Sequence, residues 1–83
     1  MQYLKGLIAN FSNNLVSGVI PGGIGEKCKS MLVFDTAGNR ITGVIPQSFG
    51  ALRSLVELGL SRNRLQGEIP SSFQNLTGLN FCH

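Results

Sequence analysis

The feature of this sequence that most constrains its fold is a repeat of 24 to 25 residues. Three segments share one pattern, in which asparagine is followed at fixed intervals by an aliphatic residue, a glycine and an Ile-Pro pair. They are NLVSGVIPGGI (14–24), NRITGVIPQSF (39–49) and NRLQGEIPSSF (63–73). A repeat of this period predicts stacked coils that bury a continuous core between them, because one unit cannot bury its apolar face alone.

The residues before each asparagine repeat as well. Three positions that we expect to face the core recur in each repeat. The most regular repeat has Leu55, Leu58 and Leu60 at these positions. The preceding repeat has Met31, Phe34 and Thr36, and the first repeat has Gly6, Ala9 and Phe11. Alternation of apolar and other residues is the pattern of a short strand with one face inward. We therefore expect strands near 9–12, 33–36 and 57–60, and helix only as single turns near 50–52 and 74–76.

The repeated asparagines Asn14, Asn39 and Asn63 are interpreted as structural residues. An asparagine side chain carries two donors and one carbonyl acceptor, so it can bond the backbone of neighbouring coils. Stacked at one phase of the repeat, the three side chains would form a ladder.

Composition narrows the classes of function. Charged residues make up 13% of the 83 residues, and the net charge of +3 comes from scattered lysines and arginines without a basic run, which argues against a nucleic-acid partner. No apolar run approaches the roughly 20 residues that a membrane span needs. Polar residues interrupt the first 15 positions, so we expect neither a signal peptide nor direct membrane contact by this segment.

The chemistry-bearing residues do not form a catalytic or metal-binding set. Cys28 and Cys82 are far apart without a CxxC partner, and His83 is the one histidine, so no metal or other cofactor is expected. The two cysteines should be unpaired, because the strands of a sheet are about 4.8 Å apart and two such steps exceed the roughly 7 Å limit between bridged Cα atoms. Asp35 and Glu57 lack a nucleophile or metal beside them, so an enzyme is not predicted.

These motifs resemble the leucine-rich repeat in its plant-specific form, LxxLxLxxNxLxGxIPxxLxxL. The distinguishing GxIP portion stands here as GVIP (18–21), GVIP (43–46) and GEIP (67–70). The resemblance covers residues 1–83, as repeats at about 6–30, 31–54 and 55–78 and a truncated fourth at 79–83. It implies an α/β solenoid, a right-handed coil with short parallel strands on its concave face, a second short strand at the Gly-x-Ile portion, and little helix.

A longer stretch, residues 28–70, is similar to the ectodomains of plant receptor-like kinases of the receptor-like protein kinase 2 / Toadstool 2 group. That resemblance implies a non-catalytic recognition scaffold for a peptide, a protein or a co-receptor, on the extracellular face of the plasma membrane. The parent would carry a serine/threonine kinase, whose motifs are absent from this chain. A secreted inhibitor of the polygalacturonase-inhibitor type and a truncated gene product without independent function remain alternatives.

The candidate binding residues are those between the inward positions, which should face solvent on the concave side. They are Val33, Asp35, Ala37, Glu57, Gly59, Ser61, Arg62 and Arg64, with Asn10, Ser12 and Asn13 in the first repeat. Arg62 or Arg64 could bind a peptide carboxylate. The alternative is a solvated face that binds no ligand.

Two N-glycosylation sequons occur, at Asn10-Phe11-Ser12 and Asn75-Leu76-Thr77. Asn75 falls in a loop between repeats and is the preferred site, because a glycan on Asn10 would crowd the concave face.

The terminal repeats are incomplete and should leave apolar core exposed, including Phe11, Leu79 and Phe81. We therefore expect the isolated chain to be partly unfolded or self-associated.

Overall fold

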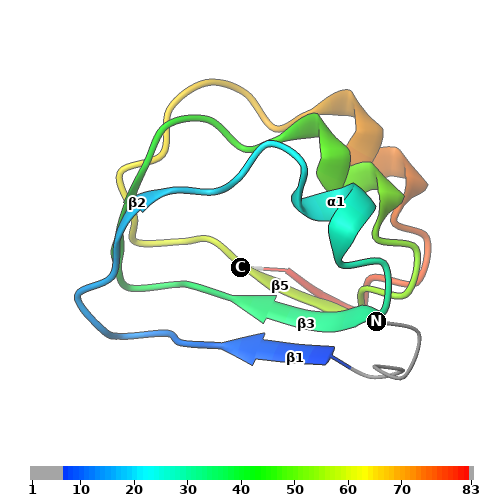
Figure 1. Cartoon of the computed structure of the whole chain (residues 1–83), viewed down its shortest axis with the longest axis horizontal. Coiled ribbons are helices and arrows are strands. Elements are labelled where there is room, and N and C mark those ends of the chain that lie inside the picture. The colour runs from blue at the N-terminus through cyan, green and yellow to red at the C-terminus, as the bar shows by residue number, and fades with distance from the viewer. Residues whose placement is uncertain (1–6, 83) are drawn as a thin grey trace.

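The computed structural model describes residues 7–82, with side chains up to residue 80, as successive coils stacked side by side (Figure 1). The first strand of each coil joins a parallel sheet in the order β1 (Leu7–Asn10), β3 (Met31–Asp35), β5 (Glu57–Gly59) and β6 (Phe81–Cys82). A second parallel pair is β2 (Ser17–Val19) with β4 (Arg40–Thr42). Each complete coil closes with a helical turn, α1 (Ile24–Lys27), η1 (Gln47–Ala51) or η2 (Ser71–Asn75). We call residues 7–30, 31–54 and 55–78 coils 1, 2 and 3.

The described residues thus form a leucine-rich-repeat type of solenoid with parallel strands and little helix. In Figure 1 the four-stranded sheet runs along the lower side, and the three helical turns stack at the opposite corner. Within residues 7–82, no helix is long and apolar enough to cross a membrane.

The core lies between the four-stranded sheet and the helical turns. Phe49, Leu52, Leu55 and Leu58 have no exposed surface, and burying each such side chain stabilises the fold by about 1.5–3 kcal/mol.

Four phenylalanines also connect one coil to the next through this core. Ring pairs Phe11–Phe34, Phe34–Phe49 and Phe49–Phe73 meet edge to face, with centroids 5.8, 5.5 and 5.9 Å apart. Such pairs contribute about 0.5–1.5 kcal/mol beyond the burial of their area. The coils are therefore held in place by a continuous line of aromatic contacts as well as by the sheet.

The Asn39 side chain joins coil 1 to coil 2. Its Nδ2 donates to the carbonyls of Phe11 and Thr36, each at 2.9 Å. Its Oδ1 accepts the N–H groups of Asn14 at 3.1 Å and Val16 at 3.0 Å. One buried side-chain amide thus provides hydrogen-bond partners for backbone groups at the turn, where no neighbouring strand pairs with them.

The Asn63 side chain repeats this arrangement one coil further on. Its Nδ2 donates to the Thr36 carbonyl of coil 2 at 2.8 Å, and its Oδ1 accepts the Ile41 N–H at 2.9 Å. Asn14 differs, because its Nδ2 donates within coil 1, to the carbonyls of Phe11 and Ser12.

The strands begin earlier than the sequence pattern predicts in coils 1 and 2. A register shift between Leu7 and Ile8 places Leu7 opposite Met31, where Leu7 packs against the core. The repeat phase assigns this inward place to Gly6, which lies outside the described residues. Coil 1 therefore fills its core better than its sequence pattern indicates.

The two helical turns predicted near 50–52 and 74–76 are present and overlap those ranges, but a third turn was not predicted. Both turns begin three residues earlier than predicted, directly after Pro46 and Pro70, which stand at the N-cap with extended ψ values of 140° and 141°. The third turn, α1, was missed because the glycines of Gly-Gly-Ile-Gly are poor helix formers.

Cys28 is free, as predicted, and its half-buried side chain packs against the core. The side chain of Cys82 lies outside the described residues, so the prediction for that thiol stands as a prediction.

Replacing Asn39 by alanine should destabilise the chain by an amount on the order of 2–5 kcal/mol, since the N–H groups of Asn14 and Val16 would lose their acceptor. The matched control is Asn14→Ala, which removes bonds within one exposed coil and should cost less. Urea unfolding followed by circular dichroism measures both. Equal losses for the two variants would contradict the inter-coil role of Asn39.

Gly25→Ala should also destabilise the chain, because a Cβ at this buried glycine would overlap the backbone carbonyl of Ser48 in the next coil. Overpacking of this kind costs about 1–3 kcal/mol. Gly22→Ala is the control, since a Cβ there meets no atom within 4 Å. A Gly25→Ala variant that unfolds at the same urea concentration as Gly22→Ala would show that the coils can move apart without loss.

Candidate functional site

The outer face of the four-stranded sheet is the main candidate surface. The pairing register aligns Ile8, Val33 and Glu57 across three strands in one row. Asn10, Asp35 and Gly59 form the next row toward the ends of the strands. Ile8 is exposed, and Val33 and Glu57 are half-buried, so the first row offers apolar surface beside a carboxylate.

The expectation that Asp35, Ala37 and Gly59 face solvent is wrong, because all three are buried. Asp35 is 6% exposed, and its carboxylate turns back to accept the Ala37 N–H at 3.0 Å. Ala37 is 1% exposed because its turn lies between those of coils 1 and 3, with backbone hydrogen bonds on both sides. The middle coil loses exposure simply because it has a neighbour on each side.

The other candidates remain accessible. Val33, Glu57 and Ser12 are half-buried, and Asn10, Asn13, Ser61, Arg62 and Arg64 are exposed.

Three exposed arginines lie in the segments that follow the four-stranded sheet, Arg40 as the first residue of β4, and we call Arg40, Arg62 and Arg64 the arginine edge. Arg40 and Arg64 each follow a ladder asparagine, and their N–H groups donate to the carbonyls of Val16 and Ile41 in the preceding coils. Arg40 was not among the residues predicted from the sequence, although it occupies the same phase of the repeat as Arg64.

Arg62 is held in a left-handed backbone conformation, with φ of 56°. The same place in the other coils is occupied by Asn13 and Gly38, with φ of 57° and 74°. Asparagine and glycine adopt this conformation readily, whereas an ordinary side chain there costs about 1–2 kcal/mol. Arginine is thus present at a position where the backbone disfavours it.

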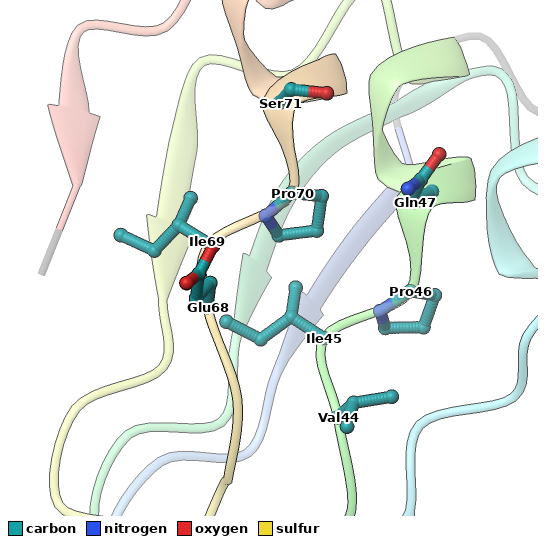
Figure 2. Close-up of a pocket in the computed structure, with 8 residues that line it drawn as sticks. All are labelled: Val44, Ile45, Pro46, Gln47, Glu68, Ile69, Pro70 and Ser71. Carbon is teal, nitrogen blue, oxygen red and sulfur yellow. The ribbon is translucent and has the colours of Figure 1, made fainter.

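A shallow pocket of about 490 Å³ lies between the Ile-Pro segments of coils 2 and 3 (Figure 2). The segments 44–47 and 68–71 line it, and each proline lacks the N–H that could bond the adjacent coil. Glu68 is the one charged residue among those that line it.

The described residues offer no group of three or more His, Cys, Asp or Glu side chains that could hold a metal ion. Both sequon asparagines, Asn10 and Asn75, are exposed. The side-chain Oδ1 of Asn10 accepts from the N–H and the hydroxyl of Ser12, at 3.3 and 3.2 Å.

Comparison with known proteins agrees with this architecture. Residues 54–76 match the family model for the leucine-rich repeat. Among curated proteins, the chain is 41% identical over 46 residues to the receptor-like protein kinase BRI1-like 3 of Arabidopsis thaliana, a match that covers 55% of this chain and 4% of that protein.

Two solved structures extend the comparison to most of the chain. The BIR2 ectodomain of Arabidopsis thaliana superposes with a TM-score of 0.83 and 32% identity, covering 87% of this chain and 38% of that one. The plant peptide hormone receptor RGFR1, solved in complex with RGF2, superposes with a TM-score of 0.77 and 41% identity, covering 82% of this chain and 11% of that one. The chain spans much less than two thirds of each relative.

The repeat, the stacked coils and these matches define a leucine-rich-repeat chain. More particularly, it is similar to the ectodomains of plant receptor kinases. Nothing in the matches shows a kinase domain within these 83 residues.

Proposed function

We propose that this chain is a non-catalytic recognition module that binds an extended peptide across the outer face of its four-stranded sheet. In this proposal the coil is right-handed, the sheet face is its concave side, and the parent protein is a receptor-like kinase that displays the module outside the plasma membrane. The relative RGFR1 is described as a peptide hormone receptor in complex with RGF2, which supports a peptide as the ligand class.

The observation that carries the proposal is the arginine edge beside the sheet face. Arg40, Arg62 and Arg64 are exposed, and Arg62 occupies a position whose backbone conformation is unfavourable for arginine. Strained residues that persist are enriched at binding sites. A guanidinium group binds a carboxylate through two parallel hydrogen bonds, so an acidic side chain or a free C-terminus would fit this edge.

The sheet face supplies the second part of the site. Ile8 and Val33 offer apolar contact to an extended chain, and Glu57 adds polar contact in the same row. A peptide lying along this row would run parallel to the arginine edge, and its C-terminal end would have to turn across the row of Asn10, Asp35 and Gly59 to bring its carboxylate to the arginines. The site would gain only its shape from Asp35, Ala37 and Gly59, because their side chains are too buried to contact a peptide.

The arginines can be tested with an array of secreted plant peptides, each made with a free and an amidated C-terminus. Arg64→Ala should weaken binding of the free-carboxylate forms by roughly tenfold to a hundredfold, since a hydrogen bond to a charged group contributes about 1.5–3 kcal/mol. Arg53→Ala is the matched control, because Arg53 is an exposed arginine in the turn after η1. Biolayer interferometry measures each affinity.

Arg62→Asn separates function from stability in the same experiment. Asparagine suits the left-handed conformation, so thermal stability should be unchanged or higher by up to about 1 kcal/mol, while peptide affinity falls. Equal weakening by Arg53→Ala, or affinity that is indifferent to amidation, would refute the proposed carboxylate site.

We also propose that Asn75, and less so Asn10, carries an N-linked glycan when the chain passes through a secretory pathway. Both are exposed, but a glycan on Asn10 would lie on the sheet face beside Asp35. With a secretory leader fused to the chain, Asn75→Gln should abolish most of the mass shift that enzymatic deglycosylation produces, whereas Asn10→Gln should leave most of it. The reverse result would exclude Asn75 as the main site.

A further inference from the structure

Apolar side chains border the outer sheet face on the side where its strands begin. Leu32 and Val33 lie near the start of β3, Val56 directly precedes β5, and all three are half-buried. They are not among the half-buried apolar side chains that pack against the core. The Val56 N–H donates to the Leu32 carbonyl at 2.8 Å, so these two residues stand side by side in adjacent coils. We call Leu32, Val33 and Val56 the apolar edge.

The arginine edge borders the same face on the side where the strands end, and its segments contain no acid. Residues 36–44 and 60–67 follow β3 and β5, and they include the three arginines but neither aspartate nor glutamate. Arg40 and Arg64 occupy the same phase of adjacent coils, whose strands are about 4.8 Å apart. Two like charges at this spacing favour a ligand that brings one carboxylate to each of them.

The row between the two edges is a floor over which a peptide backbone can lie. Asp35 and Gly59 are buried in this row and pair with each other across β3 and β5. The row is two residues from Val33 along β3, a distance of about 6.8 Å. Successive side chains of an extended chain point to opposite sides. A peptide above this floor therefore turns alternate side chains to the apolar edge and to the arginine edge.

We propose that the peptide ligand ends in the order aliphatic, acidic, aliphatic, and that Arg40 selects the acidic residue next to the C-terminus. This inference rests on the proposed function, in which Arg62 and Arg64 of coil 3 bind the terminal carboxylate. An extended chain advances about 3.4 Å per residue, and the terminal carboxyl carbon lies about 1.5 Å beyond its Cα. The penultimate residue is thus about one coil behind that carboxylate, at coil 2, where its own carboxylate meets Arg40. The side chains on either side of it turn to the apolar edge.

Glu57 determines which way round the ligand lies. It pairs with Val33 across the sheet and directly follows Val56, so its carboxylate lies beside the apolar edge. A ligand carboxylate turned to this border would meet a like charge, whereas one turned to the arginine edge meets opposite charges. The order of the last three residues of the ligand, and not their composition alone, therefore decides how tightly it binds.

Synthetic peptides with a shared Gly-Ser leader and a free C-terminus test the role of Arg40 on the full chain. They end in Leu-Asp-Leu, in the neutral Leu-Asn-Leu, or in Asp-Leu-Leu, which has the composition of the first in another order. Isothermal titration calorimetry should show Leu-Asp-Leu binding roughly tenfold to a hundredfold more tightly than the other two. Arg40→Ala should remove this preference, whereas the control Arg53→Ala, at another exposed arginine, should keep it.

Amidated copies of the same peptides separate this inference from the proposed function. Binding that needs the free terminus but ignores the order of the last three residues overturns the inference alone. A preference for Leu-Asp-Leu that survives Arg40→Ala also overturns it. Failure of every peptide to bind overturns the inference together with the proposed function.

The apolar edge is tested by changing both partners of its contact. Val56→Ser should weaken binding of the Leu-Asp-Leu peptide by roughly fourfold to tenfold, and it should leave a Ser-Asp-Ser peptide unaffected. Val44→Ser is the matched control, because Val44 is a 62% exposed valine that lies beside the Ile-Pro segment of coil 2 and not on the four-stranded sheet. Circular dichroism melts check that both variants are folded. Equal effects of the two variants, or an equal effect of Val56→Ser on both peptides, would overturn the proposed orientation of the ligand.

Discussion

The side-chain amide of the repeated asparagine is the interaction on which the rest of this structure depends. Where the chain leaves the sheet and turns, its backbone groups lose their strand partners, and a buried unpaired group would be costly. Asn39 replaces those partners by bonding Phe11 and Thr36 with its amino group and Asn14 and Val16 with its oxygen. Because three of these four partners belong to coil 1 and the fourth, Thr36, belongs to coil 2 with Asn39 itself, the amide fixes the spacing between the two coils.

Close contact between coils then determines how the remaining side chains pack. At the helical turns, Gly25 lies against Ser48 and Gly50 against Ser72, so tightly that a Cβ would not fit at either glycine. The Gly25 N–H donates to the Ser48 hydroxyl, and the Ser72 hydroxyl donates to the Gln47 carbonyl. On the inside of the same coils, the phenylalanine rings meet edge to face.

A stack of coils has two kinds of surface that are available for binding, namely its sides and its end faces. The outer sheet face and the arginine edge run along the stack and grow with each coil, which suits an extended ligand. The end faces are different, since they consist of core residues that a neighbouring coil would cover. Charged side chains are exposed in all three coils: the arginines lie in coils 2 and 3, and Glu26, Lys27 and Lys29 lie in coil 1.

The sequence by itself determined the repeat, the solenoid class and the phases of the strands and of the bridging residues Asn39 and Asn63, because a fixed period admits few arrangements. It also placed Asn14 in the same ladder, but the side chain of Asn14 donates within coil 1. It did not predict which outward residues stay accessible. Asp35 and Ala37 follow the outward pattern, yet coils on both sides and the hydrogen bond between them remove them from solvent. Nor did it predict that a register shift would bring Leu7 into the place of Gly6, or that α1 would form in a glycine-rich segment. Those outcomes depend on contacts between residues about 24 positions apart, and only the stacking of coils decides which side chains such contacts bury.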